Sequence, residues 1–263
     1  MSTKLGTLTL DLVARIGNFT AGMRQASSSA EREMGRASSS VNVMTGMLGK
    51  LAATAGAAFS VGQIISYTDK YTGLQNKLKL VTNSQSELNA AMQDTFAIAQ
   101  NTGSAWDSTA MVYQRFADNA KRLGITMSET ASLTETVSKA ISISGGSAAS
   151  AEAALMQFGQ ALASGVLRGE EFNSISEQAP GLLKAIAKGM GVNIGELRAM
   201  AGEGKITGDV LVDSLSKAKP YIDDLFNKTD FTIGNSITQL SNAVTQFVGE
   251  AGKGSGAASA LSD

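Results

Sequence analysis

Three pairs of carboxylates are the residues in this chain whose types and spacing could carry out a reaction. The pairs are Glu170 with Glu171, Asp223 with Asp224, and Glu129 with Glu135. A glycosidase needs two carboxyl groups roughly 5 to 9.5 Å apart, one as acid and one as nucleophile or base. Adjacent residues on a helix point about 100° apart and seldom converge on one substrate. We therefore expect these carboxylates to face solvent or to cap helices, and we expect no catalytic residue.

The composition excludes most other active-site chemistry. The 263 residues include no histidine and no cysteine, which removes the common general base, the commonest metal ligands and the thiol nucleophile. The absence of cysteine also excludes disulfides, which fits folding in a reducing cytoplasm. With 22 basic and 23 acidic residues the net charge is -1, so no overall positive field attracts nucleic acid or anionic lipid. We expect no metal, no cofactor and no specific nucleic acid partner.

Residues 168–201 read as a series of short helices that turn sharply. Pro180 fits the first position of a helix, where its missing N–H donor costs nothing. Gly191 is placed to end that helix. Asn193 and Glu196 have the spacing of a capping box for the next one. The local chemistry of this stretch predicts helix boundaries and no active site.

This stretch resembles the signature segment of phage tail tape measure proteins. In that family an Arg-Gly-Glu-Glu-Phe opening precedes a Gln-x-Pro turn, a short apolar helix, a Gly-Val break and a Leu-Arg-x-Met-Ala-x-x-Gly-Lys stretch. The residues that match are Arg168, Gly169, Glu170, Glu171, Phe172, Gln178, Pro180, Gly191 and Leu197, with an apolar segment at 182–190. The likeness extends upstream through Tyr71, Gly73, Leu74 and Asn76 and through Ala105 to Asp107, so it covers roughly residues 65–263. The pattern assigns these residues a structural role and carries over no catalytic residue.

The resemblance implies a structural assembly protein of the virion. Tape measure proteins are long, largely helical proteins around which tail tube subunits polymerise, so that their length sets tail length. They lie in the lumen of the tube, after assembly in the host cytoplasm, and leave ahead of the DNA during injection. The partners implied are the tail tube protein, tail tip or baseplate hub proteins, tail assembly chaperones and, on ejection, the host envelope.

The chain is short for a ruler of this kind. Written as one unbroken helix, 263 residues would reach only about 390 Å. We therefore interpret it as the N-terminal part of a tape measure protein, either truncated or from a split or remnant prophage gene. For such a piece, contact with tube, tip or chaperone is a better expectation than measurement of length.

The predicted fold class is all-α, with one short N-terminal β-strand, a long N-terminal amphipathic helix and then a compact bundle of short helices. Residues 7–12 alternate polar and apolar, as in a strand. From Phe19 to Ile65 apolar or small residues recur at steps of four and three, which predicts a helix about 70 Å long that associates with other copies. We expect three regions: 1–66, an oligomerisation arm; 67–230, the compact helical domain; and 231–263, a helix start and a Gly-rich linker.

Capping signals and apolar stripes predict the helices of the compact region. Ser84 with Glu87 and Thr126 with Glu129 have capping-box spacing, and Gly103, Gly124 and Gly145 are placed to end helices. The aromatic residues Trp106 and Tyr113 are predicted core anchors, as are Phe172, Leu182, Leu183 and Ile186 of the signature segment. A helix that begins after Thr207 is expected to end before Pro220.

A second seam of apolar residues follows near the end of the chain. Ile233, Ile237, Leu240, Val244 and Phe247 alternate steps of four and three, which gives two heptads before the Gly-rich stretch 249–256. Together with the Phe19–Ile65 seam, this pattern predicts a homo-oligomer, a trimer or a hexamer.

Two other functions remain open at this point. A membrane-active or pore-forming protein that acts at the host envelope would use residues 44–65, which are apolar but interrupted by Lys50 and Gln63. An enzyme of peptidoglycan cleavage would need Glu170 or Glu171 as a catalytic group. Structural assembly is the interpretation that the residues favour.

Overall fold

The structure is a computed structural model that describes the backbone of residues 61–255 and the side chains of residues 66–250. Within that range the chain forms helices, and its only strand-like pairing is an isolated bridge between Val166 and Thr207. The described part therefore confirms the all-α class. The predicted N-terminal strand and most of the predicted long helix lie outside the described residues.

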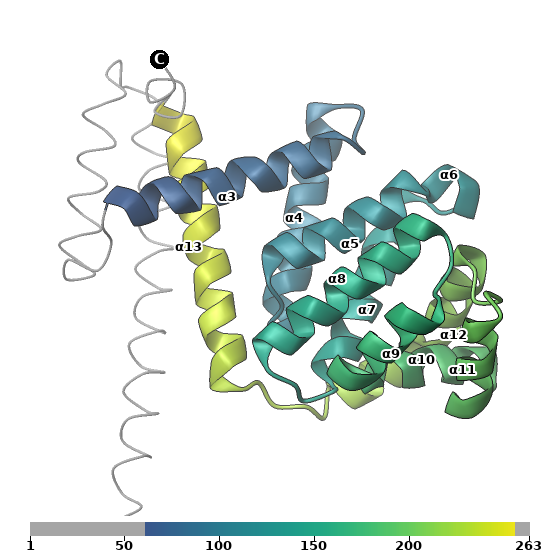
Figure 1. Ribbon diagram of the computed structural model, residues 1–263. Coiled ribbons are helices and arrows are strands. Elements are labelled where there is room, and N and C mark those ends of the chain that lie inside the picture. Colours follow the sequence, from purple (N-terminus) through teal and green to yellow (C-terminus); the bar gives the residue numbers. More distant parts are fainter. Residues whose placement is uncertain (1–60, 256–263) are drawn as a thin grey trace, which may run out of the picture. The chain divides into compact units, whose positions relative to one another are not determined.

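The described helices follow one another with short connections (Figure 1). They are α3 (Val61–Lys79), α4 (Gln85–Thr102), α5 (Trp106–Asp118), α6 (Ala120–Leu123), α7 (Met127–Ser142), α8 (Ala148–Ser164), α9 (Gly169–Gln178), α10 (Pro180–Met190), α11 (Ile194–Gly202), α12 (Gly208–Phe226) and α13 (Ile233–Ser255). By contacts the chain divides into two units, one of residues 73–242 and one of the residues before and after that range. The predicted region boundaries at 66 and 230 stay predictions.

Local capping defines most of these helices as the sequence predicts. Thr126 and Asn193 form complete capping boxes with Glu129 and Glu196, each side chain accepting from the other residue's backbone N–H. At α4 the box is incomplete, because Ser84 accepts from the Glu87 N–H while the Glu87 carboxylate accepts from the N–H of Asn83. Glycines in the left-handed conformation cap the C-termini of α4, α6, α8 and α10.

Helix α7 lies at the centre of the 73–242 unit, in contact with α4, α5, α8, α10 and α12. Its buried face carries hydroxyl groups as well as Val137 and Ile141. Thr134 donates to the carbonyl oxygen of Thr130 and Thr136 to that of Ser132, each at 2.8 Å, so these hydroxyls are satisfied within the helix itself. A helix with such short side chains lets five neighbours approach closely.

The hydrophobic core around α7 is continuous and built mainly from aliphatic residues. Phe116 of α5 and Phe158 of α8 meet there with ring centroids 5.9 Å apart. Trp106 and Tyr113 are 3% and 1% exposed, which confirms them as core anchors. The signature residues predicted to be buried are also confirmed: Phe172, Leu182, Leu183 and Ile186 are each at most 1% exposed.

Two glycines bring α10 into backbone contact with its neighbours. At Gly181 a Cβ atom would lie 2.5 Å from the carbonyl oxygen of Ala140 in α7. The Gly181 N–H also donates to the Ser144 hydroxyl at 2.9 Å, just beyond α7. At Gly189 a Cβ atom would overlap the backbone of Ser214 in α12. Only glycine therefore permits this spacing of α7, α10 and α12.

Two predicted helix boundaries are wrong, and a third boundary was not predicted. Helix α12 continues through Pro220 to Phe226, because the exposed proline ring faces solvent while Ile222 beyond it is fully buried in the core. Helix α3 runs through Ile65 and past Gly73 to Lys79, because its later turns bury Leu74 and Leu78, which are 1% and 0% exposed. The chain before the predicted helix end at Gly124 has a further boundary at Asn119, which separates α5 from α6 and whose side-chain amide donates to the carbonyl oxygen of Arg115.

The predicted Gly-rich linker is also wrong over its described part. Helix α13 continues to Ser255 instead of ending near Gly249. Gly249 is buried, and a Cβ atom there would overlap the Tyr71 ring of the same unit. This glycine therefore serves close packing and not flexibility. Burial, with the nearby Glu250 carboxylate, raises the pKa of Tyr71 to about 12.

Gly189→Ala should lower the free energy of unfolding by about 1–3 kcal/mol or more, because its methyl group would force α10 away from the α12 backbone. Gly202→Ala is the matched control, since a Cβ atom at this last residue of α11 would meet nothing within 4 Å. We expect the control to unfold at the same or a slightly higher denaturant concentration. Equal behaviour of the two variants in urea unfolding would contradict the close packing described here.

Candidate functional site

The signature segment forms the end of the loop before α9, the helices α9 and α10, and all but the last residue of α11. Arg168 is the N-cap of α9 in extended conformation, Gly169 is its first residue, and Glu170 and Glu171 occupy its first turn. Their carboxylates lie where the unpaired N–H groups of a helix favour negative charge. Phe172, one residue on, is fully buried. The opening of the signature thus starts a helix and anchors it in the core.

The other signature residues end one helix and begin the next. Gln178 is the last residue of α9 and donates to the Ser174 hydroxyl at 3.1 Å. Pro180 is the first residue of α10, as predicted, and Gly191 caps its C-terminus with φ 71°. Leu197 of α11 is fully buried. These positions are ones where a change of residue would alter the path of the chain.

A cation also covers the core at this segment. The Arg198 guanidinium of α11 lies 5.2 Å from the centroid of the Phe172 ring. The same side chain donates to the Asn173 amide oxygen at 3.0 Å. Arg198 therefore joins α11 to α9 from outside, and the Leu-Arg pair of the signature places one side chain in the core and one over it.

The predicted carboxylate pairs do not act as pairs in this structure. Glu129 accepts from both the N–H and the hydroxyl of Thr126, and these hydrogen bonds lower its pKa. Asp223 contacts two lysines, whereas its neighbour Asp224 pairs with Lys228 at 2.6 Å. Glu135 lies beside Asp223, whereas the sequence suggested Glu129 as its partner.

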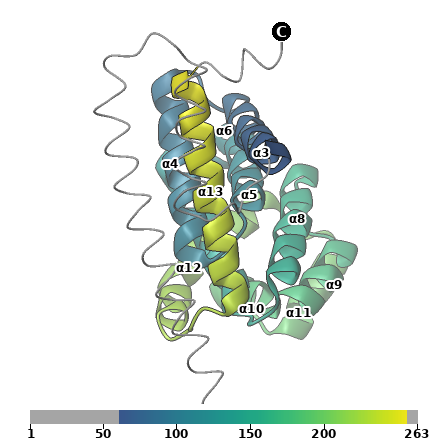
Figure 2. The ribbon, with the colours of Figure 1, turned by 90° about the vertical axis from the view of Figure 1, so that its left-hand side faces the viewer.

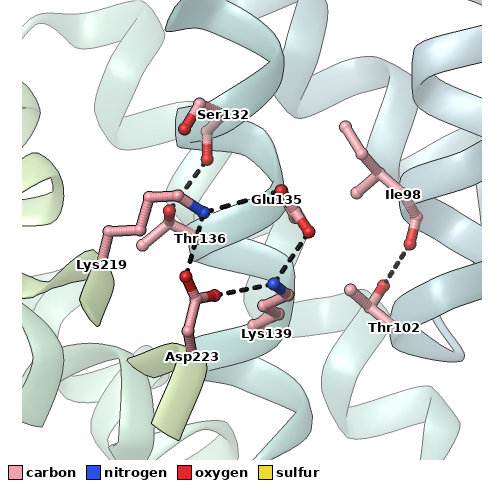
Figure 3. Close-up of polar contacts among 8 residues, drawn as sticks. All are labelled: Ile98, Thr102, Ser132, Glu135, Thr136, Lys139, Lys219 and Asp223. Carbon is pink, nitrogen blue, oxygen red and sulfur yellow. Dashed lines mark hydrogen bonds and ion pairs between the residues drawn. The ribbon is translucent and has the colours of Figure 1, made fainter. Parts of the chain in front are cut away.

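Four charged side chains of α7 and α12 form a closed network (Figure 3). The Lys139 ammonium lies 2.8 Å from a Glu135 oxygen and 2.7 Å from an Asp223 oxygen. The Lys219 ammonium lies 3.2 Å from the other Asp223 oxygen and 3.7 Å from the other Glu135 oxygen. Each carboxylate therefore contacts both lysines, and the alternation of charge ties α12 to α7.

The network stabilises the charged forms of Lys139 and Asp223. Partial burial lowers the pKa of Lys139, but its hydrogen bonds to Asp223 and Glu135 outweigh this and raise the pKa above its ordinary value. Partial burial likewise raises the pKa of Asp223, but hydrogen bonds from Lys139 and Lys219 outweigh it and hold that pKa below its ordinary value. A carboxylate so strongly paired is a poor general base. The arrangement is suited to fixing two helices in place.

A second polar contact holds the first part of α13, residues 233–242, beside the end of α4 (Figure 2). The Gln100 and Gln239 amides each donate to the backbone carbonyl oxygen of the other residue, at 3.0 and 2.7 Å. Asn242 is 5% exposed; it donates to the Ser104 carbonyl oxygen at 2.8 Å and accepts from the Trp106 N–H at 3.1 Å. We call this set the amide clamp.

The amide clamp determines which side of α13 lies against the ends of α4 and α5. Asn235, Gln239 and Asn242 recur at steps of four and three, and Asn235 also donates to the Gly103 carbonyl oxygen, at 3.2 Å. Ile233 and Ile237 of the predicted seam lie on the opposite side of the helix and are each 59% exposed, whereas Val244 of the same seam is 5% exposed. Sequence reasoning followed the apolar period and missed the amides, although these share its spacing.

A groove of about 490 Å³ opens beside the start of α10. Its lining comes from the C-terminal ends of α7 and α12 and the first turns of α10: Ile143, Ser144, Pro180, Gly181, Lys184, Tyr221, Leu225, Lys228 and Thr229. Two lysines and no acidic residue line it. The signature residue Pro180 lies on its edge, but nothing in the sequence pattern predicts the groove.

Neither metal binding nor a membrane span is evident in the part of the chain that the structure describes. In that part, no group of three or more acidic side chains is placed to hold a metal ion. Nor does any helix there combine the length and the apolar character needed to cross a membrane. Residues 44–65, on which the membrane-active alternative depends, all lie outside the described side chains.

Comparison with known proteins gives one family. Residues 62–253 match the family model described as tape measure protein. This range holds all of the helical signature described above. No curated protein and no solved structure matches the chain.

Asn242→Ala should detach α13 from the corner between α4 and α5. The change leaves the buried Trp106 N–H and Ser104 carbonyl without their partners, at a cost of about 2–4 kcal/mol in the free energy of unfolding. Trp106 is the chain's single tryptophan, so its fluorescence reports the site directly and should shift to the red. Thr238→Ala, on the same helix, removes only a hydroxyl that bonds to its own helix backbone. If Asn242→Ala unfolded with the same free energy as this control, the amide clamp would contribute nothing to stability.

Asp223→Asn should lower the free energy of unfolding by about 1–3 kcal/mol at neutral pH, because two lysines lose a charged partner. The Asp223 pKa is lowered on folding, so its contribution is present above the ordinary value of 3.8 and is lost as pH falls below it. The difference in the free energy of unfolding between the variant and the parent protein should therefore disappear in acid. Lys139 has the opposite pH dependence. Its contribution to stability is complete below pH 10.5 and is lost as the pH rises above that value.

The adjacent Asp224→Asn is the control for this measurement. Asp224 pairs with Lys228 on the solvent side of the same helix, where both side chains are more than 60% exposed. Such a pair contributes about 0.5 kcal/mol or less. Denaturant titrations of both variants across pH would contradict the network if position 223 proved no more sensitive than position 224.

Proposed function

Because this chain belongs to the tape measure protein family, and so has a structural role in a phage tail, we propose that it acts as the scaffold around which the tail tube polymerises. The match over residues 62–253 is the observation that carries the proposal. In this role the chain is the N-terminal part of a tape measure protein that sets tail length, lies in the tube lumen and is released during DNA injection. The family is structural and not catalytic, and we propose that the chain has no enzymatic activity.

The arrangement of the described helices supports a role in assembly. Among the carboxylates that could have served hydrolysis, Glu129 caps a helix and Glu135 and Asp223 pair with lysines between helices. The exposed groups include large apolar side chains, among them Phe231, Ile233 and Ile237. Exposed apolar surface of this kind is typical of a protein that meets partners.

The proposed partners are the tail tube protein, the tail tip or baseplate hub, and the tail assembly chaperones. We further propose that copies of the chain associate as a trimer or hexamer. The apolar face of α13 supports this, since the amide clamp turns that face outward and leaves Ile233 and Ile237 exposed. The host cytoplasm is then the site of assembly, and the virion tail the final location.

Protease protection of purified tails tests the proposal. Tails would be isolated from cells that produce the phage or prophage encoding this chain, and treated with protease before and after DNA ejection is triggered. A protein in the tube lumen should survive in intact tails and be absent from the tube after ejection. Cleavage in intact tails, at the same rate as for the free protein, would overturn the lumenal location.

A further inference from the structure

The groove beside the start of α10 combines positive charge with apolar surface, and this combination identifies the kind of molecule that fits it. We propose that the groove is a docking site for an acidic segment of a partner protein that also carries a large apolar side chain. The inference rests on the chemistry of the groove itself and not on the proposed role in tail length.

The charge of the groove is only partly compensated. Lys184 is exposed, and among the described residues no ion pair forms to it. Lys188, one turn further along α10, lies over the Tyr221 ring at 5.7 Å from its centroid and neutralises no carboxylate there. Lys228 pairs with Asp224 at 2.6 Å on the solvent side. A carboxylate that enters the groove therefore meets one ammonium group without an acidic partner, that of Lys184, and a second, that of Lys228, which Asp224 also contacts.

Four of the other lining residues present apolar surface, beside the hydroxyl groups of Ser144 and Thr229. Ile143, Pro180, Leu225 and the ring of Tyr221 line the groove, and Tyr221 is 37% exposed. A volume of about 490 Å³ falls within the range of sites that enclose a few side chains. An aliphatic or aromatic side chain of the partner would gain burial there, while its acidic neighbours reach the lysines.

The walls of the groove are fixed before any partner arrives. The Gly181 contact with α7 holds the start of α10 in place, and its N–H donates to Ser144, which also lines the groove. The charged network of Lys139, Lys219, Glu135 and Asp223 fixes the C-terminal part of α12 against α7. A preformed surface of this kind loses little conformational freedom on binding.

These features favour a protein segment over nucleic acid. Nucleic-acid sites depend on several Lys or Arg contacts to successive phosphates. This groove has lysines at two of its lining positions and apolar groups at four, in a chain of net charge -1. A phosphate backbone has no apolar side chain to place against Leu225 and Tyr221.

Selection from a library of random short peptides on the immobilised full-length chain tests the proposal. We expect the selected peptides to be acidic with an aliphatic or aromatic residue among the acids. The affinity of a selected peptide, labelled with fluorescein and measured by anisotropy, should fall by roughly tenfold or more in the double variant Lys184→Glu, Lys228→Glu. The control double variant Lys205→Glu, Lys217→Glu has the same net charge but reverses exposed lysines outside the groove lining, and should bind the peptide as the parent does.

A charge exchange distinguishes loss of binding from loss of folding. A version of the peptide with lysine in place of each acid should bind the Lys184→Glu, Lys228→Glu variant better than it binds the parent. The proposal is overturned if no acidic peptide is selected, or if the groove and control variants bind the acidic peptide equally. It is also overturned if the lysine peptide binds the groove variant no better than it binds the parent. It is also overturned if a labelled single-stranded oligonucleotide binds at these lysines in preference to the peptide.

Discussion

The close backbone contact of α10 with α7 and α12 is the constraint on which the rest of the 73–242 unit depends. Only 5% of the residues are aromatic, so the core has few large side chains to span wide spaces between helices. Gly181 and Gly189 remove the side chains that would separate the backbones. At this spacing small aliphatic residues fill the core, and the Lys139 and Asp223 side chains of α7 and α12 are close enough to meet. The groove beside α10 is the surface that results where these three helices end.

Helix α13 shows how a polar interface can leave apolar surface for other uses. Amides at Gln239 and Asn242 satisfy backbone groups at the end of α4 and the start of α5, where the chain turns and its carbonyl and N–H groups need partners. Because polar groups hold this part of the helix, Ile233 and Ile237 are not needed for its attachment and stay exposed. We propose that this surface joins the chain to other subunits of the tail.

Local signals in the sequence predicted local features well. The capping boxes at Thr126 and Asn193 depend on residues three apart, and Pro180 and Gly191 act on the backbone at their own positions, so all four could be recognised without a fold. The core residues of the signature were also predictable, because the apolar period of a short helix shows which face is buried. The signature itself led to the family that the comparison then gave.

Features that depend on distant residues could not be predicted in this way. Pro220 lies inside α12 because the turns on both sides of it are held by tertiary contacts, which outweigh the local preference to end the helix. Lys139 and Asp223 are 84 residues apart, and Gln100 and Gln239 are 139 apart, so no spacing rule links them. Gly249 was read as flexible because its packing partner, Tyr71, lies far away in the sequence. The groove needed the ends of three helices to be placed together before it could be seen.

Hydrogen exchange of the full-length chain, followed by mass spectrometry, tests the central claim that contact among α7, α10 and α12 holds the unit together. The account predicts that amides of α7, α10 and α12 exchange most slowly and in a single cooperative unit. The comparison that decides is α10 against α11, two short helices that follow one another in the chain. Exchange from α10 as fast as from α11 would contradict the claim and place the stable core of the unit elsewhere.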